Sequence, residues 1–123
     1  MIENKEKISY ERKINLFLTQ SFLMIGLNNA NIGTYYFKEL IKLAYFKNII
    51  DIKYKDLCLM LSKKLNISIY KIESNIYTSI NSININIAKR NFKDIFSIEF
   101  DYFYVSPKKL TILFLNLLYN KFY

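Results

Sequence analysis

The segment Leu61–Ile76, LSKKLNISIYKIESNI, constrains the fold of this chain more than any other part of the sequence. Two amphipathic patterns with helical spacing meet within it: Leu61 and Leu65 belong to the first, and Ile72 and Ile76 to the second. Almost nothing separates them that could form a loop. Two helices this close in sequence must pack against each other across a tight turn.

The residues around this turn meet the packing demands of a helix-turn-helix. The small Ser62 follows an apolar residue where the two helices would touch, and Asn66 tolerates the left-handed conformation expected at the turn. Ile67 can fill the turn, and Ser68 can accept hydrogen bonds from the free amides of the second helix. An ordinary helical hairpin is the alternative interpretation, because the pattern is short.

Apolar residues at helical spacing predict further helices before this segment. The first nine residues are charged and are expected to be flexible, so the folded domain is predicted to cover residues 10–123. A helix is predicted from Tyr10 to about Ile25, ended by Gly26, and Thr34 is expected to cap the next one. That second helix should bury Phe37, Leu40, Ile41, Ala44 and Tyr45. A third helix, about Tyr54 to Leu65, should pack through Leu57, Cys58 and Leu61, and a fourth, after Ser68, through Ile69, Ile72, Ile76 and Ile80.

The C-terminal third of the sequence is less regular. In INSININIAKRN, Ile and Asn alternate as in a strand, but directly after a helical pattern, so we predict helix to about Ile87. NFKDIFSI suggests a short helix and EFDYFYV an extended segment, and Pro107 suits the first turn of a last helix through about Phe122. The expected fold is therefore one all-α domain, a compact bundle of about six helices that contains the helix-turn-helix.

The last predicted helix is apolar nearly all round. Such a helix is either deeply buried or forms half of an interface. On the second alternative, the residues that contact a partner would be Ile112, Leu115 and Tyr119.

The residue inventory argues against catalysis. The chain has no histidine and a single cysteine, Cys58, which excludes an imidazole metal ligand, a Ser-His-Asp or Cys-His pair and an internal disulfide. We expect no enzyme activity, no metal and no cofactor. No apolar stretch approaches the roughly 20 residues of a membrane span, so the chain is expected to be cytoplasmic, with no membrane partner.

The charge balance favours a polyanionic partner. Eighteen Lys and Arg residues against ten Asp and Glu give a net charge of +8, and such a surface attracts nucleic acid. If DNA is bound, the expected base-facing residues are those of the second helix of the pair: Ser68, Tyr70, Lys71, Glu73, Ser74, Tyr77 and Thr78. The expected phosphate contacts are basic residues around it: Lys53, Lys55, Lys63, Lys64, Lys89, Arg90 and Lys93.

The order of these motifs resembles a known family. The chain contains, in order, GTYYFKELI, LSKKLN with KIESNI, and Pro107 before a terminal apolar helix. This arrangement is similar to the C-terminal DNA-binding effector domain of the sporulation response regulator. This is the master transcription factor of endospore-forming bacteria. The resemblance covers roughly residues 14–122 and implies a six-helix domain whose fourth helix enters the major groove of DNA.

Two departures from that family shape the functional expectation. The chain starts too late to hold the family's phosphorylated receiver domain, so it is expected to act as a stand-alone effector. The family's recognition-helix arginines are also missing, and only Lys71 and Glu73 match. Arginine reads guanine through two hydrogen bonds, so we expect an A·T-rich target or weakened base reading.

These departures leave two hypotheses. The first is a sequence-specific transcription regulator that binds double-stranded DNA, in which a dimer would suit two half-sites one helical turn apart. The alternative is a protein-interaction module that pairs with a full-length regulator or RNA polymerase without reading DNA.

Overall fold

The described part of the chain forms six α-helices and one short 3-10 helix, and it contains no strand. A computed structural model describes residues 2–49, 51 and 53–122, apart from the side chains of residues 2–4. The helices are α1 (Ile2–Met24), α2 (Ile32–Phe46), α3 (Tyr54–Leu65), α4 (Ile69–Asn81), α5 (Ile85–Phe96) and α6 (Pro107–Phe122), with the 3-10 helix η1 (Tyr102–Tyr104) between α5 and α6. The prediction of an all-α bundle of about six helices is confirmed.

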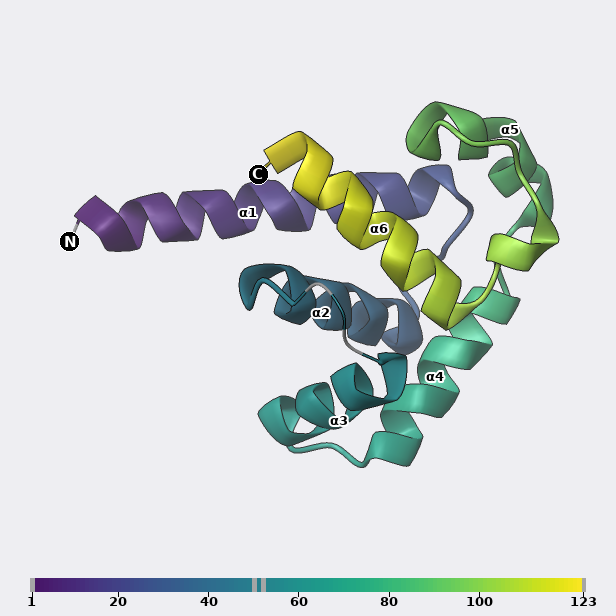
Figure 1. Cartoon of the computed structure of the whole chain (residues 1–123). Helices are drawn as coiled ribbons and strands as arrows, with labels where there is room; N and C mark the ends of the chain where they lie inside the picture. The colour runs from purple at the N-terminus through teal and green to yellow at the C-terminus, as the bar shows by residue number, and fades with distance from the viewer. Residues whose placement is uncertain (1, 50, 52, 123) are drawn as a thin grey trace.

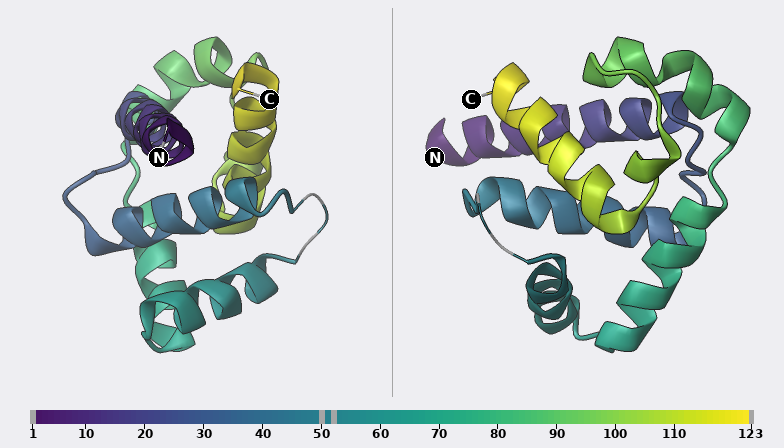
Figure 2. Two further views of the ribbon diagram at one scale, coloured as in Figure 1. Left: turned by 90° about the vertical axis from the view of Figure 1, so that its left-hand side faces the viewer. Right: turned by 45° about the vertical axis from the view of Figure 1, so that its right-hand side comes forward.

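Helix α2 lies at the centre of this bundle. It contacts α1 and α6 on one side and α3 and α4 on the other, as Figures 1 and 2 show. All five of its predicted inward residues are buried, and they form one apolar core with α1, α4 and α6. The helix that follows in sequence, α3, has the predicted bounds and buries the three predicted residues Leu57, Cys58 and Leu61.

Helix α1 begins earlier than the apolar pattern predicted. It runs from Ile2, eight residues before Tyr10, and its first turns project beyond the other helices (Figure 1), with the side chains of residues 5–9 exposed. Helical structure in residues 2–9 follows from the good helix propensity of Glu and Lys, which needs no apolar face. Flexibility of this segment stays a prediction. Gly26, with φ +88°, follows the helix end as expected.

The turn between α3 and α4 has the local geometry that its sequence predicts. Asn66 is left-handed, with φ 56° and ψ 48°, and its amide donates to the carbonyl of Ser62. The Ser62 hydroxyl donates to the carbonyl of Ile67, which fastens the turn to α3. Ser68 occupies the N-cap position of α4, but its side chain makes no capping hydrogen bond. The turn is therefore held by Ser62, and the expected cap by the Ser68 side chain is wrong.

Two further boundary predictions are wrong for local reasons. Helix α2 begins at Ile32 with Asn31 as its N-cap, so Thr34 lies inside the helix, buried, and caps nothing. Helix α4 ends at Asn81 and does not continue to Ile87. Asn84 starts α5 instead, because its side chain accepts from the amide of Ile87 and its own amide donates to the carbonyl of Gly26.

The last segments fold largely as expected. The predicted short helix in NFKDIFSI is the second half of α5. EFDYFYV was expected to be extended, and this is wrong for residues 102–104, which form η1 because the Asp101 side chain accepts from the amide of Phe103. Pro107 is the first residue of α6, which has the predicted bounds. Helix α6 contacts α2, α3, α4 and η1, which explains why so much of its surface is apolar.

Candidate nucleic-acid interface

Helix α4 has one buried face and one exposed face. Ile72, Ile76 and Ile80 are fully buried, and Ser79 beside them is 5% exposed. This side of α4 lies against α2 and α3, which fix the orientation of the helix. Residues at the intervening positions must therefore point to solvent, because successive positions of a helix turn by about a quarter of a circle or more.

All seven side chains predicted to face bases lie outside the core. Six of them are exposed, and Glu73 is half-buried. Tyr70 and Tyr77 stand out, because large aromatic side chains that are 83% and 61% exposed are unusual in a folded domain. The exposed face of α4 thus carries two tyrosines, a lysine, a carboxylate and three hydroxyl-bearing side chains: Tyr70 and Tyr77; Lys71; Glu73; Ser68, Ser74 and Thr78.

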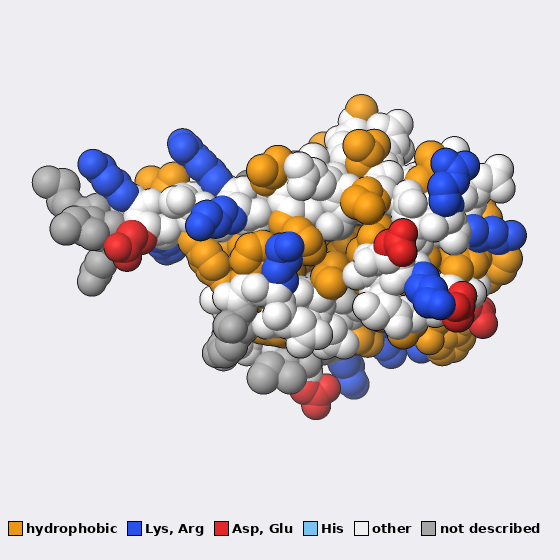
Figure 3. Space-filling model, turned by 90° about the horizontal axis from the view of Figure 1, so that it is seen from above, with side chains coloured by type: hydrophobic (Ala, Val, Ile, Leu, Met, Phe, Trp, Pro, Cys, Tyr) orange, Lys and Arg blue, Asp and Glu red, His pale blue; other side chains and the backbone are white. Residues whose placement is uncertain are grey.

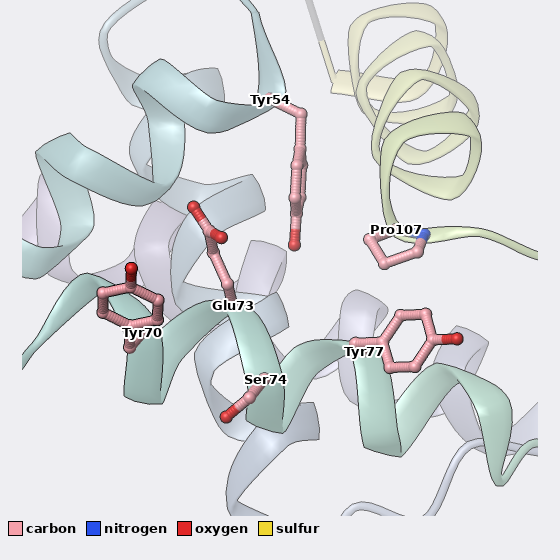
Figure 4. Close-up of a pocket in the computed structure, with 6 residues that line it drawn as sticks. All are labelled: Tyr54, Tyr70, Glu73, Ser74, Tyr77 and Pro107. Carbon is pink, nitrogen blue, oxygen red and sulfur yellow. The ribbon is translucent and has the colours of Figure 1, made fainter.

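A shallow groove of about 340 Å³ runs beside this face (Figure 4). Its α4 wall is made of Tyr70, Glu73, Ser74 and Tyr77. Tyr54 reaches toward it from the start of α3, and Pro107 closes it at the start of α6, opposite Tyr77. The exposed face of α4 is therefore continuous with the beginnings of α3 and α6.

The groove contains one fixed negative charge. Burial, together with the neighbouring Cys58 and Glu73, raises the pKa of the Tyr54 phenol. Burial likewise raises the pKa of the Cys58 thiol to about 11. Both groups are neutral at pH 7, as their ordinary pKa values already imply, and Glu73 is the only acidic side chain among the described residues that line the groove. A carboxylate at such a place accepts hydrogen bonds and repels phosphates.

Four of the lysines predicted to contact phosphates lie at the two ends of α3. Lys53 and Lys55 are at its beginning and Lys63 and Lys64 are at its end, and all four side chains are exposed. Within the described residues none of the four forms an ion pair. Their charges are therefore available to a polyanion, and the resulting binding would depend on salt.

The three basic residues predicted on α5 differ from one another. Lys93 donates to Glu99 at 2.8 Å, and this hydrogen bond and charge raise its pKa. Lys89 holds its ammonium 5.2 Å from the centre of the Tyr102 ring. Arg90 is exposed. Because an ion pair must open before Lys93 can hold a phosphate, Lys93 is the weakest of the predicted phosphate contacts.

The predicted partner contacts on α6 fall in different environments. Ile112 is 48% exposed, whereas Leu115 is 8% exposed and packs into the core. Tyr119 is half-buried, lies 5.2 Å from the Tyr45 ring and donates to the carbonyl of Ile49. Leu115 is therefore a core residue, and its prediction as a partner contact is wrong. Of the three predicted partner contacts, only Ile112 has an exposed side chain.

Tyr54 and Pro107 line the groove but were not among the predicted site residues. Each is the first residue of a helix, α3 or α6. Their approach to α4 depends on how three helices pack, and no local pattern in the sequence carries that information. The capping role of Pro107 was predictable, and its position opposite Tyr77 was not.

Comparison with known proteins identified no relative of this chain. No protein-family model, curated protein or solved structure matches the chain significantly. None of the helices that the structure describes has the length and apolarity to cross a bilayer. Three or more His, Cys, Asp or Glu side chains do not gather into a potential metal site anywhere in the described part. What the exposed face of α4 does must therefore be inferred from its own chemistry.

Proposed function

We propose that this chain is a DNA-binding transcription regulator that uses α3 and α4 as a helix-turn-helix. The observation that carries the proposal is the exposed face of α4, whose predicted base-facing side chains all lie outside the core while the opposite face is anchored on α2 and α3. A helix held in this way can enter a major groove without unfolding its supports.

Charge supports the same proposal. The chain carries +8 overall, and lysines that form no ion pair with any described residue lie at both ends of α3. The motif order that resembles the sporulation regulator effector domain points in the same direction. Such a regulator acts in the cytoplasm.

The chemistry of α4 favours contacts to A·T-rich DNA. The only basic side chain on the exposed face of α4 is Lys71, and the helix has no arginine that could form two hydrogen bonds with guanine. Tyr77 can touch a thymine methyl group, and Ser74 can exchange hydrogen bonds with either kind of base edge. Glu73 can accept from the amino group of cytosine. We therefore expect modest base discrimination on top of a large phosphate contribution.

The direct test is fluorescence anisotropy with duplexes of different sequence over a range of salt concentrations. Lys63→Ala or Lys71→Ala should weaken binding to every sequence and flatten the plot of log K against log salt by about one unit. Ser74→Ala or Tyr77→Ala should instead change the ranking of sequences. Lys13→Ala, on an exposed position of α1, is the matched lysine control and should leave both readouts unchanged.

Each result has a definite meaning. If the lysine variants weaken binding and the Ser74 and Tyr77 variants change nothing on any sequence, the protein binds DNA without reading it. If the parent protein binds no duplex even at low salt, the DNA-binding proposal is wrong.

A second candidate function, pairing with another protein, is favoured by one observation. Helix α1 carries exposed apolar side chains along its length: Ile8, Leu16, Leu23 and Met24 are 51%, 58%, 65% and 44% exposed. Figure 3 shows that hydrophobic side chains reach the surface at several places on the face seen from above, with Lys and Arg side chains among them and toward both ends. A regulator or RNA polymerase could cover this face, and a second copy could use the exposed Ile112. If the parent protein binds no DNA, pairing with another protein becomes the leading proposal.

A further inference from the structure

The segment between α5 and α6 presents two aromatic rings to solvent on a well-anchored turn. Tyr102 and Phe103 are 60% and 61% exposed. Phe100 and Tyr104 beside them are half-buried and pack against Phe92 of α5, with ring centroids 5.5 and 5.7 Å away. The outward position of Tyr102 and Phe103 is thus set by the inward packing of the residues beside them.

Backbone hydrogen bonds hold this turn in place. The Asp101 side chain accepts from the amide of Phe103 at 2.8 Å, and the amide of Tyr104 donates to the carbonyl of Asp101. The amide of Val105 donates to the carbonyl of Tyr102. A turn closed by three such bonds keeps its two rings exposed at little further cost in conformational entropy when a partner binds.

Each exposed ring has an ammonium group over its face. Lys109, in the first turn of α6, holds its Nζ 4.1 Å from the centre of the Phe103 ring. Lys89, from α5, lies 5.2 Å from the Tyr102 ring. Two helices thus each supply one cation to one turn, and the cations flank rings that carry no charge. Apolar rings bordered by cations suit a partner that has phosphates on either side of less polar groups.

This patch adjoins the exposed face of α4. Pro107 lines the groove beside Tyr77, and η1 ends three residues before Pro107 and contacts α6. In Figure 2 the segment that contains η1 lies next to the start of α6, above the C-terminal part of α4. A polyanion that lies along α4 would therefore meet Lys109 and the two rings where it continues beyond the helix.

We infer that η1, with Lys89 and Lys109, is a second DNA-contacting element that grips the duplex beside the site occupied by α4. In this arrangement Tyr102 and Phe103 contact the sugars and base edges of the neighbouring minor groove, and the two lysines hold the phosphates on its rims. Proteins that insert apolar side chains into the minor groove use the same combination of wedge and cation. The inference rests on the proposed DNA binding and extends the contacted length by roughly half a helical turn, about 5 base pairs.

The test compares a short duplex, just long enough for α4, with a duplex extended by about one helical turn on each side. Lys109→Ala should flatten the salt dependence by about one unit on the long duplex and change little on the short one. Tyr102→Ala combined with Phe103→Ala should lower affinity on the long duplex on the order of tenfold without changing the salt slope. Lys13→Ala and Leu16→Ala, at exposed positions of α1, are the matched controls.

A spectroscopic readout separates contact from an indirect effect on folding. The chain has no tryptophan, so Phe103→Trp introduces a single reporter at the turn. Its emission should change when the long duplex is added and stay constant with the short one. Circular dichroism checks that each variant keeps the helical spectrum of the parent.

The outcomes distinguish the inference from the proposal beneath it. If Lys71→Ala weakens binding and the η1 variants match the parent on both duplexes, the inference is wrong and the DNA-binding function stands. If the parent binds no DNA at all, both are wrong. Cosedimentation with phosphatidylserine vesicles then asks whether the rings and lysines serve an anionic membrane, and binding that Phe103→Ala abolishes would assign the patch to that surface.

Discussion

Replacing Gly33 by alanine should destabilise this protein by about 2 kcal/mol or more, or prevent it from folding. Gly33 lies in the first turn of α2, where the helix meets α4. A Cβ atom at this position would lie 1.9 Å from the carbonyl oxygen of Asn75 and 2.3 Å from the hydroxyl of Ser79. The hydroxyl can rotate away, but the carbonyl belongs to the backbone of α4, so the whole helix must shift.

Two opposing effects decide the sign of this change. Alanine has the higher helix propensity, which would stabilise α2 by about 1 kcal/mol. Overpacking of a filled contact costs about 1–3 kcal/mol and occasionally more, and an overlap this severe belongs at the upper end. The steric term therefore dominates. Folded domains are stable by only about 5–15 kcal/mol, so the loss is a large fraction of the total.

Urea denaturation followed by far-ultraviolet circular dichroism measures the effect, and the proposed DNA binding would provide a second readout because α4 moves. Ile32→Ala is the control, since Ile32 precedes Gly33 in the same turn and is 51% exposed. It should change stability by about 0.5 kcal/mol or less. An unfolding midpoint for Gly33→Ala equal to that of the parent would contradict the close approach of α2 and α4.

The sequence predicted the α3–α4 pair well because the relevant signals are local. Apolar spacing defined both helices, and Asn66 could be recognised as the left-handed residue from its type and position alone. Pro107 marked the start of α6 for a similar reason. Each of these signals acts within a few residues, so no knowledge of the rest of the fold was needed.

The errors arose where distant segments decide the local structure. Asn84 begins a new helix partly because its amide bonds to Gly26 in the loop after α1, and nothing in SININI indicates that contact. Thr34 resembled a cap, yet α2 starts earlier, at Ile32, with Asn31 as its N-cap. The pairing of Lys93 with Glu99 likewise depends on how the chain turns after α5. The outward face of α4 was predictable from periodicity, but the groove beside it needed the packing of three helices.

Replacing Phe114 by alanine should remove about 3–5 kcal/mol of stability, through the loss of a fully buried side chain and the cavity that it leaves. The ring of Phe114 connects α6 to three other helices. Its centroid lies 5.0, 6.1 and 5.0 Å from the ring centroids of Phe22 of α1, Phe37 of α2 and Phe96 of α5, and each pair is edge to face. Such aromatic pairs add about 0.5–1.5 kcal/mol each beyond the area they bury.

With a urea dependence of about 1–3 kcal/mol per molar, the unfolding midpoint of Phe114→Ala should fall by more than about 1 M. Phe103→Ala is the matched control, because the same side chain is removed from a position that is 61% exposed. Its midpoint should stay close to that of the parent. Equal losses at the two positions would mean that η1 supports the fold, whereas a loss at Phe114 alone shows that the ring of Phe103 is free to serve a partner.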